Sequence, residues 1–111
     1  MNKIIYTLLT IITFSFITTN ATAGAEARGS RSCGVWIADK VDIIQSHDNE
    51  SWLIGYLSGL AIASDKNILF NIDNPTLILW TDNYCRNNPL KQLYDAGIVL
   101  FYELKKQKGL K

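Results

Sequence analysis

The strongest hydrophobic pattern lies in residues 50–64, where large apolar side chains recur every three or four positions. This spacing stacks side chains on one face of a helix and predicts a helix at the centre of the core. Gly55 and Gly59 lie four residues apart within it, although each glycine costs about 1 kcal/mol against alanine in a helix interior. We therefore predict that another helix packs closely over both glycines. The predicted core face comprises Trp52, Tyr56, Leu60 and Ala63, with Leu53, Leu57 and Ala61 beside them.

A shorter amphipathic pattern precedes this stretch and predicts a first helix from Cys33 to about Gln45. The polar run at residues 46–49 then predicts a turn, in which Asp48 or Asn49 caps the central helix. Helical spacing places these apolar residues of the first helix on one face: Cys33, Trp36, Ile37, Val41 and Ile44.

Two Asn-Pro pairs predict the remaining helix boundaries, because asparagine is a good N-cap and proline suits the first helical position. Asn74-Pro75 predicts the start of a third helix, and Asn88-Pro89 predicts its end and the start of a fourth. Residues 65–73 between the second and third helices predict a loop whose apolar side chains lie under the core. The third helix is expected to present Leu77, Trp80, Thr81, Tyr84 and Cys85, and the fourth Leu90, Leu93, Tyr94, Gly97, Leu100, Phe101 and Leu104.

These patterns predict an all-α fold, a compact bundle of about four helices. Alternating strand patterns are missing from the sequence, which argues against a parallel sheet or a β-sandwich. Gly97 is expected to receive the bulk of an opposing Trp or Tyr.

Residues 1–23 have the pattern of a cleavable export signal. Lys3 provides a positive start, an apolar run follows, and Ala21-Thr22-Ala23 has the small-residue form that signal peptidase favours. Cleavage after Ala23 would give a periplasmic protein of one domain, with an uncleaved anchor as the alternative. The predicted organisation is a signal peptide at 1–23, a flexible lead-in at 24–32, a helical domain at 33–106 and a basic tail at 107–111.

Cys33 and Cys85 are the two cysteines of the chain. In an exported protein an even cysteine count predicts a disulfide, and this one would close a loop of 85 − 33 = 52 residues. Chain entropy gives such a loop about 4 kcal/mol of stabilisation. A free or redox-active thiol pair is the alternative, although no C-x-x-C spacing supports it.

Charge and chemistry exclude several classes of function. Without Lys3 the chain has 11 − 1 = 10 basic and 10 acidic residues, and no basic stripe precedes the tail, which argues against nucleic acid as a partner. His47 lies beside Asp48 and Glu50 without a second His or free Cys, so we expect no metal site. No nucleophile and base pair stands out, and Asp82 and Glu103 have no spacing that selects them as catalytic carboxylates. We expect no enzyme activity, no cofactor and no membrane span after signal cleavage.

Three motifs carry a family resemblance. Ser32-Cys33-Gly34-Val35-Trp36, the apolar helix at 54–60, and Tyr84-Cys85 together resemble the HdeA/HdeB family. These are small periplasmic helical proteins with one disulfide in this position, and they serve as acid-stress chaperones. The layout is also similar to Tai-type periplasmic immunity proteins, which neutralise secreted cell-wall amidases. Either resemblance implies that Cys33 and Cys85 form the disulfide.

Two hypotheses of function follow. An acid-stress chaperone would loosen as its carboxylates protonate and would then bind unfolded client proteins. An immunity- or inhibitor-type module would bind a specific protein partner at neutral pH, and a homodimer stays open in both cases. The residues predicted to contact protein are Trp52, Tyr56, Trp80, Asp82, Tyr84 and Arg86.

Overall fold

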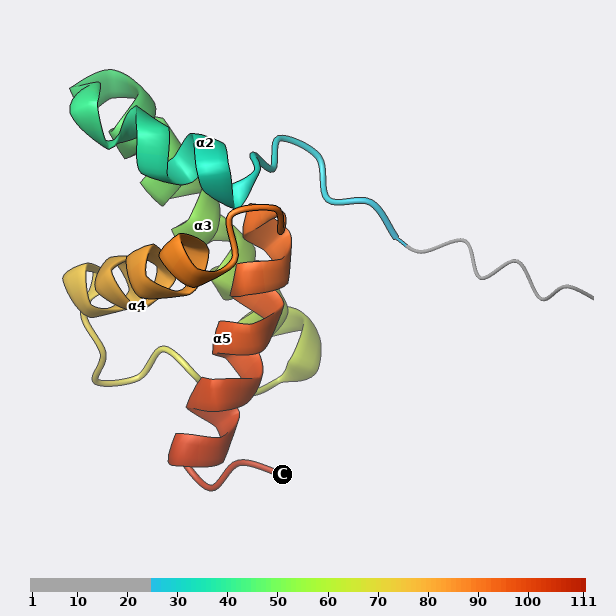
Figure 1. Ribbon diagram of the computed structural model, residues 1–111. Coiled ribbons are helices and arrows are strands. Elements are labelled where there is room, and N and C mark those ends of the chain that lie inside the picture. The colour runs from blue at the N-terminus through green and yellow to red at the C-terminus, as the bar shows by residue number, and fades with distance from the viewer. Residues whose placement is uncertain (1–24) are drawn as a thin grey trace, which may run out of the picture.

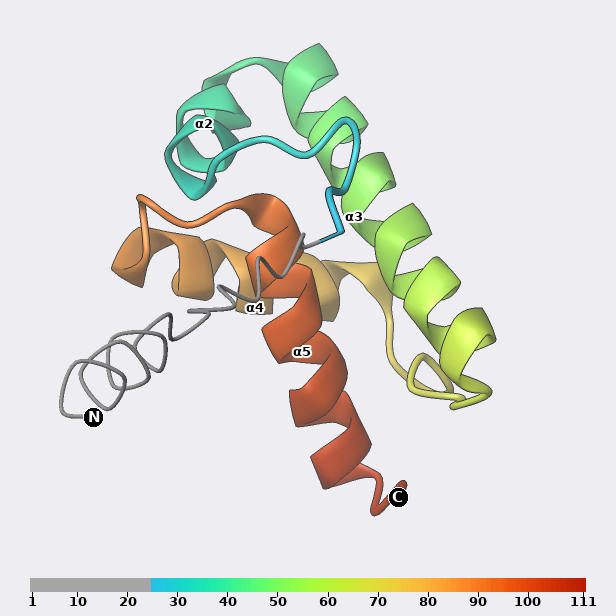
Figure 2. The same ribbon diagram turned by 90° about the vertical axis from the view of Figure 1, so that its right-hand side faces the viewer.

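The computed structural model describes residues 25–111, and the predicted signal peptide lies outside this range. Residues 25–111 form four α-helices and no β-strand, which confirms the all-α prediction. Figure 1 shows the helices in chain order from cyan to red, and Figure 2 shows α5 crossing beside the long α3. The elements are α2 (Cys33–Ala38), the 3₁₀ turn η1 (Asp39–Val41), α3 (Ile43–Ser64), α4 (Asn74–Asn87) and α5 (Leu93–Gln107).

The first helix ends earlier than predicted, and the turn predicted at residues 46–49 is wrong. Helical structure is interrupted at Asp42 instead. The carboxylate of Asp42 accepts hydrogen bonds from the backbone N–H groups of Ile44 and Gln45 and so caps α3. Residues 46–49 therefore lie inside α3. Asn49 is buried there and donates its side-chain amide to Asp39 Oδ2 at 2.8 Å, which satisfies a polar group that would be costly in an apolar core.

The early break at Asp42 also changes which side chains enter the core. Cys33 and Trp36 are fully buried, as their spacing predicted. Val41 and Ile44 are not: Val41 is 95 % exposed and Ile44 is 68 % exposed, because η1 and the first turn of α3 form a corner that projects from the bundle.

The core lies between the packed pairs α3–α5, α2–α4 and α4–α5. Leu53 and Leu57 form the buried centre of α3, whereas Trp52 and Tyr56 are half-buried at its edge and Ala63 is exposed. The buried face of α3 is therefore centred about one residue further along the chain than the predicted face. The connector at 65–73 has no helix, and Ile68 is fully buried beneath the core as predicted. Phe70 is not: its side chain is 61 % exposed. The other fully or nearly buried apolar residues are Leu77, Cys85, Leu93, Ala96, Leu100, Phe101 and Leu104.

The two Asn-Pro pairs mark the start and the end of α4 as predicted, since α4 runs from Asn74 to Asn87, but the N-cap of α4 and the start of α5 differ from the prediction. Asp73, one residue earlier than Asn74, is the N-cap of α4. The α5 helix begins at Leu93 rather than Pro89, because Gln92 and Asp95 form a reciprocal capping box. Leu90 is consequently in the turn before α5 and is almost fully exposed.

Asp73 gives the fold a local dependence on pH. Hydrogen bonds from the side chain and the backbone of Thr76 hold the pKa of Asp73 below its ordinary value of 3.8. Stability from this cap is therefore present above about pH 4 and is lost as pH falls through the lowered pKa. Asp73→Asn keeps a capping side chain without the charge, so its stability should fall less between about pH 5 and pH 2. Urea unfolding across that range measures the effect, and equal acid slopes for the two proteins would contradict it.

A disulfide joins Cys33 at the start of α2 to Cys85 near the end of α4, as predicted. Backbone hydrogen bonds reinforce the junction, since Cys33 N–H donates to Lys91 O at 2.8 Å and Gly34 N–H donates to Pro89 O at 3.0 Å. The start of α2 is thus fixed to the turn between α4 and α5.

Three glycines predicted to allow close packing have different surroundings. Gly97 of α5 is buried against the ring of Tyr56, and a Cβ at Gly97 would lie 2.6 Å from Tyr56 Cδ1, which confirms that prediction. Gly55 and Gly59 are exposed, and a Cβ at either would meet nothing within 4 Å. The prediction that α2, α4 or α5 covers them is wrong for residues 25–111, because α5 packs on the Leu53 and Tyr56 side of α3 instead.

These surroundings predict opposite effects of the same substitution. Gly97→Ala should lower the free energy of unfolding by about 1–3 kcal/mol, because the added methyl overpacks against Tyr56. Gly55→Ala and Gly59→Ala should each raise it by up to about 1 kcal/mol, since alanine is the better helix former and has open space there. Urea unfolding of the three variants measures all effects, and destabilisation at Gly55 and Gly59 equal to that at Gly97 would contradict the assignment.

Candidate functional site

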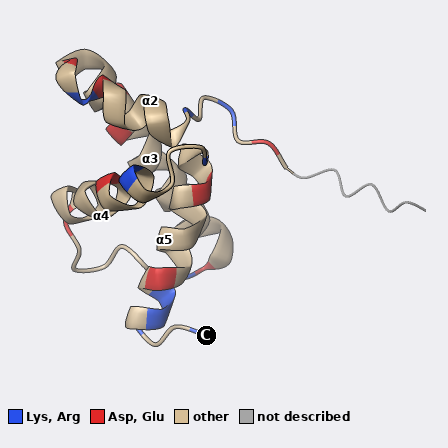
Figure 3. Cartoon of the chain, in the orientation of Figure 1, with Lys and Arg blue, Asp and Glu red and all other residues tan. Residues whose placement is uncertain are grey.

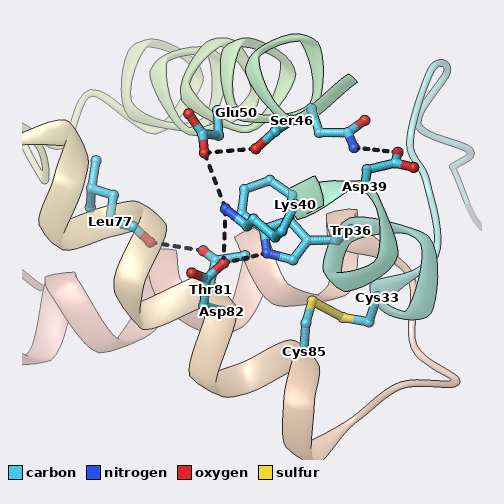
Figure 4. Close-up of polar contacts among 11 residues, drawn as sticks. Cys33, Trp36, Asp39, Lys40, Ser46, Glu50, Leu77, Thr81, Asp82 and Cys85 are labelled. Carbon is cyan, nitrogen blue, oxygen red and sulfur yellow. Dashed lines mark hydrogen bonds and ion pairs between the residues drawn. A yellow bond between two sulfur atoms is a disulfide. The ribbon is translucent and has the colours of Figure 1, made fainter. Parts of the chain in front are cut away.

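A cluster of charged side chains joins η1, α3 and α4, and we call Lys40, Glu50 and Asp82 the ionic brace (Figure 4). Lys40 Nζ lies 3.1 Å from Glu50 Oε1 and 3.1 Å from Asp82 Oδ1. The three side chains are 25 %, 27 % and 18 % exposed, so the charges are partly desolvated. One ammonium group between two carboxylates therefore holds three elements together.

The brace also holds the largest buried side chain of the core. Trp36 is 1 % exposed, and its indole Nε1–H donates to Asp82 Oδ1 at 2.6 Å. Lys40 Nζ lies 4.4 Å from the centre of the Trp36 ring, a cation–π distance. The prediction that Asp82 contacts a partner protein is not supported by this geometry, because its carboxylate is engaged inside the fold.

Lys40 and Glu50 are members of this cluster that were not predicted from the sequence. The available signals were the four-residue spacings Trp36–Lys40 and Ser46–Glu50, which place each pair on one helical face. Ser46 donates its hydroxyl to Glu50 Oε1 at 3.3 Å. Assigning residues 46–49 to a turn hid the second spacing.

The predicted aromatic contact residues form two stacked pairs on separate helices. Trp52 and Tyr56 of α3 have ring centroids 5.0 Å apart, and Trp80 and Tyr84 of α4 have theirs 5.5 Å apart, both with an interplanar angle of 12°. All four are half-buried, so each pair offers a ring edge or face to solvent. Arg86 is exposed on α4, and within residues 25–111 it has no recorded ion pair.

The chain before α2 packs against the first of these pairs. Trp52 Nε1–H donates to the carbonyl of Arg28 at 2.9 Å, and Gly29 lies against the indole with a φ of 76°, a conformation that favours glycine. Ser30 Oγ accepts a hydrogen bond from Tyr94 N–H, and Leu93 N–H donates to Arg31 O. The segment predicted to be a flexible lead-in thus contacts α3 and α5 from Arg28 onward.

The position of Tyr56 explains why the pKa of its phenol is raised. Partial burial raises the pKa of Tyr56 above its ordinary value of 10.0, and the negative charge of Asp95 and the nearby Tyr94 raise it further. The neutral phenol is therefore favoured in the folded protein. Its contribution to stability is complete below pH 10.0 and is lost as pH rises through the higher folded value.

The solvent side of α3 is uncharged over more than three turns. No Asp, Glu, Lys or Arg occurs between Glu50 and Asp65, and Ile62 is 81 % exposed. A shallow groove of about 400 Å³ runs along part of this side, with Trp52 and Tyr56 in its wall. We call the exposed residues of this side the outer face of α3: Ser51, Gly55, Gly59, Ile62 and Ala63.

A second groove, of about 460 Å³, lies between α3 and the start of α4. His47 and Glu50 line it together with Asn74 and Pro75. The Glu50 carboxylate is already bonded to Lys40 and Ser46, so it is held rather than free to act as a base. Among residues 25–111 no three His, Cys, Asp or Glu side chains are grouped to hold a metal ion, and no helix there is long and apolar enough to cross a membrane.

The geometry therefore offers two features, an uncharged outer face on α3 and an ionic brace that fixes the corner from which α3 starts. Comparisons of the chain with protein-family models, with curated proteins and with solved structures found no match.

Proposed function

We propose that the protein is an exported, non-enzymatic protein-binding module of the immunity or inhibitor type, which contacts its partner through the outer face of α3. The observation that carries the proposal is the open space over Gly55 and Gly59. Together the two glycines cost the helix about 2 kcal/mol against alanine. No part of residues 25–111 packs over them to offset that cost.

Close approach of a partner explains the glycines. Glycine on a helix surface lets another backbone come nearer than any side chain would allow. The uncharged residues of the face also favour contact, because burying Ile62 is favourable and none of them carries a charge. Arg28, which lines the adjoining groove together with Gly55, is the charged neighbour. The Trp52 and Tyr56 pair at the edge of the face adds aromatic side chains of the kind enriched at interfaces.

Rigidity of the face supports the same proposal. The ionic brace fixes the first half of α3 through Glu50, and Tyr56 packs against Gly97 of α5 at its middle. A surface held in one conformation loses less entropy on binding than a mobile one.

A pair of leucine substitutions tests the proposal. Gly55→Leu and Gly59→Leu should leave the helix content unchanged and abolish partner capture, because the bulk blocks close approach. Asn83→Leu, on the exposed side of α4, is the matched control and should retain capture. Affinity purification of crosslinked periplasm with the three proteins, followed by reconstitution with the purified partner, measures the loss. Equal binding by the glycine variants and the wild type would reject this surface, and recovery of only the protein itself would identify a homodimer.

The ionic brace favours a second candidate function, an acid-stress chaperone. At about pH 3 carboxyl groups are largely protonated, whereas Lys40 keeps its charge. Lys40 would then be partly buried without an anion. Because the disulfide holds the start of α2 on α4, we expect η1 and the first half of α3 to move away from α4 and uncover Trp36.

Tryptophan fluorescence from about pH 7 to pH 2, with a hydrophobic dye present, tests this candidate. A reversible red shift with dye uptake near pH 3 supports it, and client-aggregation assays would follow. The double variant Glu50→Gln, Asp82→Asn removes the two negative charges, and it should take up dye at higher pH than the wild type. A compact wild-type protein without dye uptake in acid would reject the chaperone function.

A further inference from the structure

The two ends of the helical domain carry opposite charge. Residues 105–111 contain Lys105, Lys106, Lys108 and Lys111 and no acidic residue. At the other end, residues 39–50 contain four carboxylates and a single lysine. Both views place the corner between α2 and α3 at the end opposite to the C-terminal end of α5 (Figures 1 and 2). Figure 3 shows blue bands at that end of α5, directly after a red band, so the positive charge lies in the last turn and the tail.

Exposed aromatic side chains lie among the lysines. Tyr102 and Phe70 are each 61 % exposed. Lys105 Nζ lies 5.8 Å from the centre of the Phe101 ring and 5.9 Å from that of Tyr102. Lys108 Nζ donates a hydrogen bond to the carbonyl of Phe70, which holds the connector before α4 against the last turn of α5. Lys105 thus contacts aromatic rings, and Lys108 joins the Phe70 segment to the end of α5. We call these residues and the remaining lysines the basic end: Phe70, Tyr102, Lys105, Lys106, Lys108 and Lys111.

We propose that the basic end docks reversibly on an anionic phospholipid surface. Lysine ammonium groups are attracted to anionic headgroups, and amphipathic rings such as that of Tyr102 favour the boundary between headgroups and acyl chains. The carboxylates of the α2–α3 corner are repelled by the same surface, so the charge separation orients the molecule with the basic end down.

The aromatic side chains distinguish a lipid surface from a soluble polyanion. A polyanion needs the lysine charges alone, and its binding would be indifferent to Tyr102. A bilayer interface also accepts the apolar part of the rings, which removes Tyr102 and Phe70 from water. The inference is separate from the proposed function, because no residue of the outer face of α3 takes part.

Vesicle sedimentation tests the inference. The protein is purified from cells that process its export signal, with the N-terminus determined by mass spectrometry, and is mixed with vesicles of phosphatidylcholine or of phosphatidylcholine and phosphatidylglycerol. The wild type should sediment with the anionic vesicles at low salt and be released at high salt. Lys105→Gln, Lys106→Gln should weaken the partition about 25-fold, since each lysine near an anionic surface contributes about fivefold.

The matched control removes two positive charges elsewhere. Arg86→Gln, Lys91→Gln, at exposed positions of α4 and the turn after it, should leave the partition nearly unchanged. Tyr102→Ser should weaken it without altering its dependence on salt. The inference is overturned by an absence of sedimentation, by equal binding to pure phosphatidylcholine, or by equal loss in the control. Complete competition by a soluble polyanion, with no effect of Tyr102→Ser, would overturn it in favour of that partner.

Discussion

Replacing Cys33 and Cys85 together with alanine is expected to lower the free energy of unfolding by about 4 kcal/mol. The disulfide closes a loop of 52 residues and so restricts the unfolded chain. Removing it raises the conformational entropy of the unfolded chain, which lowers the stability of the folded protein. A domain of this size has a total stability of about 5–10 kcal/mol. The double variant should therefore be folded at low temperature but near its unfolding transition at physiological temperature.

Urea unfolding followed by circular dichroism measures this loss. Wild-type protein unfolded in the presence of a reducing agent is the control, and it should unfold at the same urea concentration as the double variant. Both half-cystines are fully buried beside Trp36 in the core, so the alanine variant also leaves a small void. A loss below about 1 kcal/mol would show that the backbone bonds from α2 to the α4–α5 turn suffice to hold the junction.

The second large effect is expected at Trp36. Trp36→Ala should lower the free energy of unfolding by about 3–5 kcal/mol, because it removes the largest buried side chain and leaves a cavity. It also deprives Asp82 of its indole donor and Lys40 of a cation–π contact. The disulfide still holds the start of α2 on α4 in this variant, so the loosening should affect the end of α2 and η1 first.

Trp36→Phe separates the hydrogen bond from the packing. Phenylalanine retains most of the apolar volume but cannot donate to Asp82, so a loss of about 1.5–3 kcal/mol is expected from the charge-assisted bond alone. Combining Trp36→Phe with Asp82→Asn in a double-mutant cycle gives the coupling energy of the two side chains. Additive effects of the two substitutions would contradict the contact between Trp36 and Asp82.

Local rules were sufficient for much of the fold. The spacing of apolar residues predicted four helices, and the cysteine count predicted the disulfide. The role of Gly97 was predicted because glycine has no side chain and leaves room for an opposing ring. The boundary at Asp42 was not predicted, because Asp42 caps a helix through bonds to Ile44 and Gln45 while a longer polar run at 46–49 offered a stronger turn pattern. Asn49 belongs to a helix because Asp39 satisfies its amide, and that partner becomes visible only in three dimensions.

The candidate site was less predictable than the fold. A charged residue in an amphipathic helix is usually solvated, so Asp82 gave no signal that it would accept from Trp36 and pair with Lys40. Gly55 and Gly59 are the opposite case, because their pattern was visible in the sequence but its packing partner was not. Their spacing indicated close packing, but a sequence does not say whether the packing partner belongs to the same chain, and the structure places both glycines in open space.

The disulfide also determines what proteolysis can remove. The connector at 65–73 lies within the closed 52-residue loop, so a cut there leaves both fragments covalently joined and shows as two bands only on a reducing gel. A cut at residues 88–92 lies outside the loop and frees α5. The fragment that leaves carries the basic end lysines, whereas the one that remains keeps the whole outer face of α3. Cleavage within residues 88–92 would therefore break the covalent link between the two surfaces without any mutation, whereas cleavage within 65–73 would not.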